Sequence, residues 1–488
     1  MLLAATPAHT GTLSGPVFDV GVTADLEDVL QLPTTGGSPL TRINETKEAP
    51  DGSGRLFVND LRGPLYAWDG AALTPYLDLS SAVVDFRTAP GLAAGFVSFA
   101  FHPDFASNGH FYTVHTADVG SIAATHGPAV ATAIAQHAVV TEWTATNPAA
   151  TTFAGTSREL LRIESPHHFH NLGEVAFDPA LGPGDTGYGW LYIGAGDFGS
   201  VVTSQPSQLQ RLDTLYGAVL RIDPLGGTGM PYSYGIPASN PYGSDGDPNT
   251  FAEILAHGFR NAHRIHFSEK FDGPWVSDIG ESNLEEVNRL VAGENYGWPE
   301  REGTYAIDVL INPTVVFGLP PNDSTFGFRY PVAQYDHDEG AAIAGGVIFE
   351  GQIGSPLYGK FVFGDIVTGR VFYTDVAQML AADDGDPATT AQVYELTLLV
   401  GGSPDTLLEV VRDAVGNPLL PRVDLRFATD AAGTLYVTTK QDGMLRRLVP
   451  EFAAALPATP GPFGPWLLAS VLGVAAARVC RERVAPSR

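Results

Sequence analysis

Residues 259–299 read FRNAHRIHFSEKFDGPWVSDIGESNLEEVNRLVAGENYGWP, and this stretch is the most informative part of the chain. Within it, a short run rich in strand-forming residues, 273–276, begins at a glycine and is followed by Asp278. Aromatic and β-branched residues favour strands, whereas glycine and aspartate favour the turns that bound them. The stretch therefore predicts a short strand that leads into an acidic turn.

The same pattern of a glycine, a β run and an aspartate recurs along the chain. Its six copies are residues 54–58 with Asp60, 109–113 with Asp118, 189–193 with Asp197, 273–276 with Asp278, 359–363 with Asp365 and 433–437 with Asp442. Many short strands repeated at intervals are typical of a β-propeller, because radial repetition leaves few exposed edges. We predict an all-β fold that forms a six-bladed β-propeller, and even spacing disfavours the competing two-sheet sandwich.

The aspartate after each repeated strand has two interpretations. In a propeller it is well placed to point at a central pocket, and it can equally be a turn residue that closes a hairpin. We expect the turn role for most copies and regard Asp197 as the exception.

Composition supports this fold and excludes several functions. Hydrophobic residues make up 44% of the chain, and 55 glycines with 37 prolines predict many turns. The net charge of −27 disfavours nucleic-acid binding, because phosphate would be repelled. The single cysteine, Cys480, leaves the body without a disulfide or thiolate chemistry. No glycine-rich nucleotide fingerprint follows a βα unit, so NAD and FAD are disfavoured.

The two ends of the chain suggest export. We divide it into 1–40, a leader or signal remnant with the first strand region; 41–452, the propeller; and 453–488, a proline-rich linker, a short hydrophobic segment and a basic tail. Residues 463–477 are apolar and are followed by arginines, which resembles a bacterial sorting or anchoring tail. A docked amphipathic helix is the alternative, but the run is apolar on all faces. We expect membrane contact only through this tail.

A candidate general base lies in residues 165–179, SPHHFHNLGEVAFDP. The spacing allows His170 to meet Asp197 at the tops of adjacent strands, and a carboxylate beside an imidazole raises its basicity. Two other interpretations stay open. His170 can form a metal site with His167 and His168, or it can be only a hydrogen-bonded residue that lines the channel.

Four motifs together carry a family resemblance: Arg260-Asn261, the Asp-Ile-Gly of 278–280, the Glu-Glu-Val-Asn of 285–288 and the Asn-Tyr-Gly-Trp-Pro of 295–299. The chain resembles the glucose/sorbosone dehydrogenase family, whose soluble sugar dehydrogenases use pyrroloquinoline quinone (PQQ) and calcium. The resemblance spans residues 45–450. It implies a six-bladed propeller that passes hydride from the anomeric carbon of an aldose to PQQ, with electrons leaving to an external acceptor.

The resemblance also implies individual roles. They are His170 as the base, Asp197 as its orienting partner, Arg260 in catalysis and cofactor binding, Asn261 and Arg426 in cofactor binding, the carbonyls of Gly280 and Glu281 at a calcium ion that bridges to PQQ, and Glu286 with Tyr296 at a second, structural calcium ion. For Arg260 the alternative is a structural ion pair that ties blades together.

The chain departs from the family pattern at two cofactor positions. Ala93 stands where the sugar dehydrogenases carry a glutamine, and residues 366–369, Ile-Val-Thr-Gly, lack their cofactor-binding lysine. The alternative function is therefore a non-catalytic propeller at the cell surface that binds glycans or protein partners.

Overall fold

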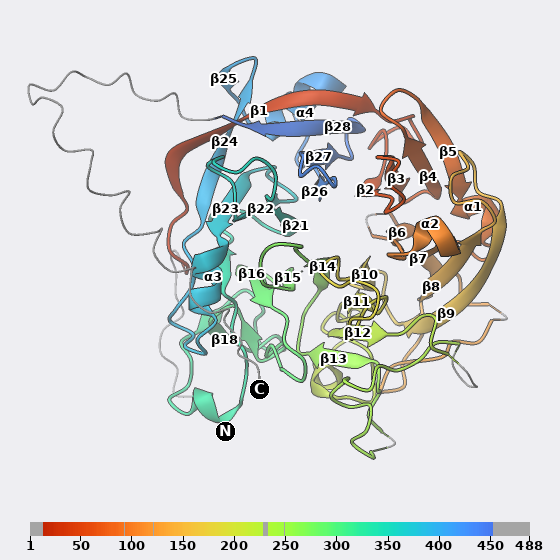
Figure 1. The fold of residues 1–488 in the computed structure, drawn as a ribbon. Coiled ribbons are helices and arrows are strands. Elements are labelled where there is room, and N and C mark those ends of the chain that lie inside the picture. Colours follow the sequence, from red (N-terminus) through yellow and green to blue (C-terminus); the bar gives the residue numbers. More distant parts are fainter. Residues whose placement is uncertain (1–12, 92, 121, 228–232, 248, 452–488) are drawn as a thin grey trace, which may run out of the picture. The chain divides into compact units, whose positions relative to one another are not determined.

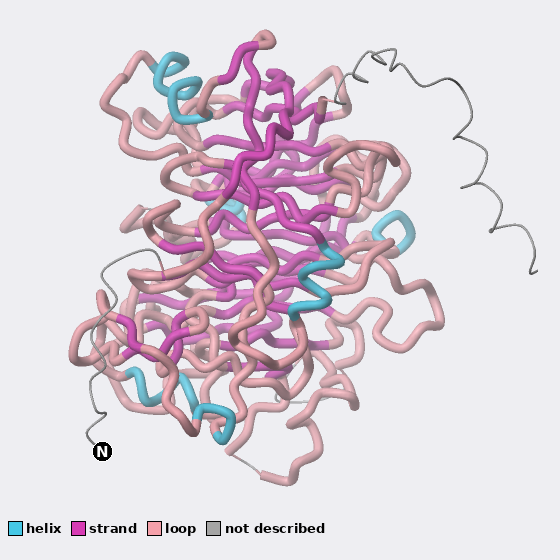
Figure 2. Tube along the Cα trace, turned by 90° about the vertical axis from the view of Figure 1, so that its left-hand side faces the viewer, coloured by secondary structure: helices cyan, strands magenta, loops and turns pink. Residues whose placement is uncertain are grey.

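The computed structural model describes residues 13–91, 93–120, 122–227, 233–247 and 249–451. Strands dominate this part of the chain, and its helices are few and short (Figure 2). The helices are α1 (Leu79–Ala82), α2 (Phe105–Asn108), α3 (Val376–Ala382) and α4 (Leu407–Val415), with 3-10 turns η1 (Pro206–Gln210) and η2 (Asp323–Thr325). The prediction of an all-β fold is confirmed.

Most strands form four-stranded antiparallel groups in chain order. The first group is β2 (Ile43–Glu48), β3 (Leu56–Asp60), β4 (Pro64–Trp68) and β5 (Leu73–Asp78). The second is β6 (Phe96–Phe101), β7 (His110–Ala117), β8 (Gln136–Ala145) and β9 (Gly155–Ser165). The third is β10 (Leu172–Ala176), β11 (Leu191–Ala195), β12 (Ala218–Ile222) and β13 (Ile254–His257). The fourth is β14 (Ala262–His266), β15 (Trp275–Asp278), β16 (Leu284–Arg289) and β20 (Ala333–Asp336).

The last two groups are joined into one nine-stranded sheet by the N-terminal strand. Its order is β21 (Ile343–Ile348), β22 (Lys360–Asp365), β23 (Val371–Asp375), β24 (Tyr394–Val400), β1 (Phe18–Gln31), β28 (Met444–Pro450), β27 (Leu435–Thr439) and β26 (Leu425–Thr429), with β25 (Ser403–Pro404) beside β24. A small separate sheet contains β17 (Arg301–Glu302), β18 (Tyr305–Ile307) and β19 (Val316–Phe317). β1 pairs in parallel with β24 and antiparallel with β28.

The first strands of the groups contact one another in a closed ring. β2 contacts β6 and β26, β10 contacts β6 and β14, and β21 contacts β14 and β26. Figure 1 shows the groups arranged around this ring, with β1 in red beside β28 in blue. The fold is therefore propeller-like, with the first strand of each group on the inside of the ring.

The sequence repeat corresponds to the second strand of each group. Its central residues Phe57, Tyr112, Tyr192, Val276, Val362 and Tyr436 lie on β3, β7, β11, β15, β22 and β27. These strands are buried on both faces because neighbouring sheets pack against them. Burying a large apolar side chain contributes about 1.5–3 kcal/mol, so the repeat marks the centre of each packed layer.

The predicted leader and tail lie largely outside the described residues, which exclude 1–12 and 452–488. Of the N-terminal region, β1 is described and belongs to the nine-stranded sheet. In the described part of the chain, none of the helices combines the length and the apolar character that crossing a membrane requires.

Candidate active site

His170 and Asp197 form the centre of the candidate site. His170 lies two residues before β10 and Asp197 two residues after β11, and these strands pair with Leu172 opposite Ala195. The pairing brings the two side chains together, with Nδ1 of His170 2.9 Å from Oδ1 of Asp197. Asp197 is 1% exposed, whereas the His170 side chain is 21% exposed. The two residues meet as their spacing predicts, and the histidine keeps access to solvent.

The backbone around this pair is strained. His170 and the neighbour of Asp197, Phe198, have φ angles of 51° and 52°, in the left-handed region. Such a residue costs on the order of 1–3 kcal/mol and persists only where its surroundings fix it. Here the Phe198 N–H donates to the His170 carbonyl at 2.9 Å, and the Asp197 N–H donates to the Arg260 carbonyl at 2.7 Å. The turn therefore holds the histidine in one orientation.

The electrostatics keep Asp197 ionised. Burial alone raises the pKa of its carboxyl group, but the charge and hydrogen bond of His170 and the charge of Arg260 outweigh burial and lower it. An ionised carboxylate accepts the Nδ1–H of the imidazole, which leaves the lone pair on Nε2. Among the described residues, Nε2 of His170 has no hydrogen-bond partner. The pair thus has the arrangement that a general base requires.

Arg260 and Asn261 lie at the start of β14, beside this pair. Asp278 fixes their backbone, accepting from the Arg260 N–H at 3.0 Å and the Asn261 N–H at 2.6 Å. The Arg260 guanidinium binds Glu281 at 2.6 Å and the Ile279 carbonyl at 3.1 Å. Its charge therefore already has one carboxylate partner, within its own strand group.

The predicted calcium ligands Gly280 and Glu281 lie in the tight turn between β15 and β16. The buried Glu302 carboxylate holds this turn, and its Oε1 accepts from the N–H groups of Glu281, Ser282, Asn283 and Leu284 at 2.8–3.1 Å. A Cβ on Gly280 would lie 1.7 Å from the Leu284 carbonyl oxygen, so only glycine fits there. The turn fixes the direction of both predicted carbonyl ligands.

The structure does not bring the side chains of Glu286 and Tyr296 together. Glu286 accepts from the Gly303 N–H at 2.5 Å and from Asn288 Nδ2 at 3.0 Å. The Tyr296 hydroxyl donates to the Arg289 carbonyl at 2.5 Å, and its ring stacks on Phe259. Among the described residues, no three histidine, cysteine or acidic side chains are grouped to hold a metal. The second calcium site remains a prediction.

A group of buried cations lies on the other side of the ring centre. Arg426, predicted as a cofactor ligand, is 6% exposed, and Lys440 and Arg42 are 6% and 7% exposed. Burial and the nearby Arg264 lower the pKa of Arg426 to about 9. Burial, followed by the charges of Arg264, Arg426, Lys440 and His170, lowers the pKa of the nearby His263.

Sequence reasoning missed Lys440 and His263. Two features of the sequence could have pointed to Lys440. Lysine is rare, with only four in the chain, and this one directly follows a repeated strand. His263 gave no such signal, because its place at the ring centre depends on the packing of β14 against β10 and β21.

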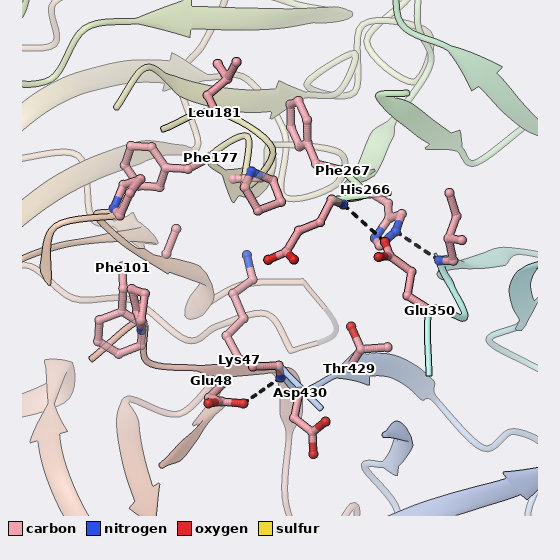
Figure 3. Close-up of a pocket in the computed structure, with 18 of the residues that line it drawn as sticks. Lys47, Glu48, Phe101, Phe177, Leu181, His266, Phe267, Glu350, Thr429 and Asp430 are labelled. Atoms are coloured by element: carbon pink, nitrogen blue, oxygen red, sulfur yellow. Dashed lines mark hydrogen bonds between the residues drawn. The ribbon is translucent and has the colours of Figure 1, made fainter. Parts of the chain in front are cut away.

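A cavity of about 580 Å³ lies at the opposite ends of the inner strands. Figure 3 shows the Lys47 side chain pointing into it, between Phe101 and Phe177 on one side and His266 and Phe267 on the other. None of the predicted site residues lines this cavity. The large cavity and the His170–Asp197 pair are therefore separate features of the molecule.

Comparisons with known proteins agree with this architecture. The family model described as Glucose / Sorbosone dehydrogenase matches residues 44–394. The HIPL2 protein of Arabidopsis thaliana is 27% identical over 374 residues, which cover 66% of this chain and 50% of that protein. The Hedgehog-interacting protein of Homo sapiens is 26% identical over 322 residues, covering 64% and 40%. The chain thus spans about half the length, or less, of these curated relatives.

Solved structures share the fold. The soluble aldose sugar dehydrogenase of Escherichia coli in its apo-form has a TM-score of 0.59 and 20% identity, covering 88% of this chain and 99% of that one. The PQQ-bound aldose sugar dehydrogenase of Streptomyces coelicolor has a TM-score of 0.53 and 19% identity, with the same coverage of 88% and 99%. At these identities the likeness shows the fold alone.

Proposed function

The chain belongs to the glucose/sorbosone dehydrogenase family, and from that premise we propose that it is an oxidoreductase that oxidises an aldose-type sugar with PQQ and calcium. The observation that carries the proposal is the buried Asp197 carboxylate 2.9 Å from Nδ1 of His170, beside Arg260 and Asn261. A binding scaffold has no need of an oriented imidazole with a free Nε2, whereas the oxidation of a hydroxyl group requires one.

The residues present fit a polycarboxylate cofactor. PQQ carries three carboxylates, and two buried guanidinium nitrogens near the ring centre lack a hydrogen-bond partner among the described residues, Nη2 of Arg42 and Nε of Arg426. Nη1 of Arg264 also lacks a hydrogen bond, but it lies 3.9 Å from the Glu45 carboxylate. Leaving such donors unpaired costs about 1–3 kcal/mol each, and more for charged groups, so carboxylates would stabilise them. For calcium the side chains offer no such support, and we propose it only at the carbonyls of Gly280 and Glu281.

When bound, PQQ supplies the two-electron acceptor for hydride from the anomeric carbon. His170 takes the proton of the anomeric hydroxyl group at Nε2, while Asp197 keeps Nδ1 protonated and stabilises the imidazolium that forms. Arg260 contributes a positive charge at the same end of the ring and holds the Asp197 N–H through its carbonyl. An external acceptor would take up the electrons.

Three further features belong to this proposal. The closed ring of β2, β6, β10, β14, β21 and β26 supports six blades, each beginning with one of these strands. Export, with membrane contact only through the C-terminal tail, suits an enzyme that acts on external sugars. The partners are then a small sugar and an electron acceptor, and the net charge of −27 disfavours nucleic acid.

The test is a titration of the calcium-loaded protein with PQQ, followed by addition of aldoses while the quinone absorption is recorded. We expect binding and sugar-dependent reduction, and we expect His170→Ala to bind PQQ but to lose reduction by about 10²–10⁴-fold. His168→Ala is the matched control, because this histidine of the same loop contacts Gln136 instead of Asp197. Folded protein that binds no PQQ, or a fully active His170→Ala variant, would contradict the proposal.

A second candidate is a non-catalytic propeller that binds glycans or protein partners. The observation that favours it is the similarity to the Hedgehog-interacting protein, together with the 580 Å³ cavity away from His170. The same titration separates the two candidates, since this one predicts no PQQ-dependent signal.

A further inference from the structure

Lys440 is a buried cation that forms no salt bridge in the described part of the chain. The chain has 54 acidic residues against 27 basic ones, so a cation that lacks a carboxylate is unusual in it. The other lysines lie within salt-bridge distance of a carboxylate: Lys47 with Glu45 and Glu174, Lys270 with Glu350 and Lys360 with Asp375. Among the described residues, the Lys440 ammonium group has neither a salt bridge nor a hydrogen bond, although the residue is only 6% exposed.

Two arginines beside Lys440 also have incompletely hydrogen-bonded side chains. Arg426 donates from Nη1 only to the carbonyl of its neighbour Leu425, and its Nε is buried without a partner. Arg42 reaches the Thr88 carbonyl with Nη1 at 3.5 Å, and its Nη2 is buried without a partner. Burying a charge is costly unless it is paired, so three neighbouring cations with free donors indicate a place for an anion.

The charge of Asp424 favours the protonated form of all three cations, but one carboxylate offsets only part of the cost of burying them. It accepts from Arg422 at 2.7 Å and from the Gln441 side chain at 3.0 Å, so each carboxylate oxygen already has one donor. Its φ angle of 61° places it in the left-handed region, which a non-glycine residue adopts only where its surroundings fix it. The chain therefore holds Asp424 in direct contact with Arg422, and its single negative charge is shared among Arg422, Arg426 and Lys440.

Lys440 follows a strand whose partner is bonded to the β22–β23 turn, and this turn lacks the lysine that the family carries. That turn, residues 366–369, is bonded to the segment beside Lys440, because the Asp424 N–H donates to the Ile366 carbonyl at 2.8 Å and the Val423 N–H to the Val367 carbonyl at 3.2 Å. Asp424 immediately precedes β26, and Lys440 immediately follows β27, where the two strands pair with Leu425 opposite Thr439. The backbone of Lys440 therefore lies on the strand that pairs with β26, whose preceding residues are bonded to the turn that lacks the lysine.

We propose that Lys440, with Arg426 and Arg42, forms a binding site for the carboxylates of a small planar polyanion, and that Lys440 supplies the cation absent from residues 366–369. The inference rests on the proposed function in naming PQQ as the ligand, while the anion site itself stands on the unpaired cations. Burial and the charges of Arg426, Arg42 and Arg264 lower the pKa of Lys440 and outweigh the opposing charge of Asp424, an effect that a bound anion would reverse.

The first experiment measures the affinity for PQQ by absorbance titration of the full chain and of Lys440→Met. We expect the variant to bind about 10–100-fold more weakly, the usual effect of losing one charged hydrogen bond. Lys440→Arg should retain most of the affinity because it keeps the charge. Lys270→Met is the matched control, since this lysine has a half-exposed side chain outside the site, and it should bind PQQ as the wild type does.

A second arm uses citrate in place of PQQ and follows thermal unfolding. If citrate raises the melting temperature of the wild type but not of Lys440→Met, while PQQ does not bind, the anion site is upheld and the proposed PQQ chemistry fails. Without any ligand, Lys440→Met should melt at the same temperature as the wild type or higher, because an unpaired buried charge is removed. A structural lysine would give the opposite result.

Two outcomes would overturn the inference. One is equal PQQ and citrate affinity in the wild type and Lys440→Met. The other is a ligand-free Lys440→Met protein that is clearly less stable than the wild type and binds neither anion differently. Should Lys440→Met fail to fold, Arg426→Met serves as the second variant and must show the same loss of affinity.

Discussion

At the scale of single residues, the repeated aspartates differ in the group that each carboxylate binds. Asp197 binds a side chain, whereas two of its counterparts bind backbone N–H groups. Asp278 accepts from the N–H groups of Arg260 and Asn261 at the start of β14, and Asp365 accepts from those of Ala341 and Ala342 before β21. Asp197 accepts instead from the His170 imidazole. The repeated aspartate is thus a structural device that, in the third group, is available to orient a base.

This contrast predicts the effect of Asp197→Asn. The amide no longer stabilises an imidazolium and no longer fixes the Nδ1–H tautomer, so we expect sugar-dependent quinone reduction to fall by about 10²–10⁴-fold. PQQ affinity should stay close to that of the wild type. Asp365→Asn is the matched control, because it weakens the turns that Asp365 holds and should lower stability while folded protein keeps its rate. Equal rates in Asp197→Asn and the wild type would show that the pair has no catalytic role.

At the scale of strands, one lysine forms salt bridges that link the inner strands β2 and β10. Lys47 on β2 lies 2.8 Å from Glu45 on the same strand and 2.9 Å from Glu174 on β10, and it donates to the Val175 carbonyl at 2.8 Å. Lys47→Met leaves two buried carboxylates beside each other, so we expect the free energy of unfolding to fall by about 3 kcal/mol. Urea denaturation measures it.

The matched control for this ion pair is the double variant Lys47→Met/Glu174→Gln. It removes one of the two carboxylates together with the ammonium group, so it should recover part of the lost stability. If the double variant is less stable than Lys47→Met, the carboxylates are not repelling each other and the argument is wrong.

The strands also show what the sequence can and cannot predict. The repeated runs identify the second strand of each group, because those strands are buried on both faces and bounded by glycine and aspartate. The meeting of His170 and Asp197 follows from their places at the ends of adjacent strands. The ion pair of Arg260 with Glu281 cannot be predicted in this way, because it depends on the conformation of the turn that contains Glu281. Lys440 was missed because its burial, at 6% exposed, depends on the packing of the inner strands and leaves no mark in the local sequence.

At the scale of the whole described unit, the ring is closed by strand β1. It lies between β24 and β28, and Ala24 within it is fully buried, opposite Leu398 on one side and Pro450 on the other. Residues near the N-terminus thus complete the last two strand groups, a pairing over some 400 positions that no local pattern predicts. Without it, β24 and β28 would each present an unpaired edge.

Ala24→Pro tests this closure. Proline removes a ladder N–H in the middle of a central strand, so we expect a loss of several kcal/mol and an earlier melting transition. The matched control is Val20→Pro, because Val20 is exposed and lies in the irregular part of β1 between Asp19 and Thr23, where the register shifts.

Because a propeller depends on each sheet packing against the next, opening β1 should also weaken the arrangement of the inner strands. PQQ binding should therefore fall together with stability in Ala24→Pro, although the altered residue is far from His170 in sequence. Retained affinity with lowered stability would mean that the site is held by its own loops and not by closure of the ring.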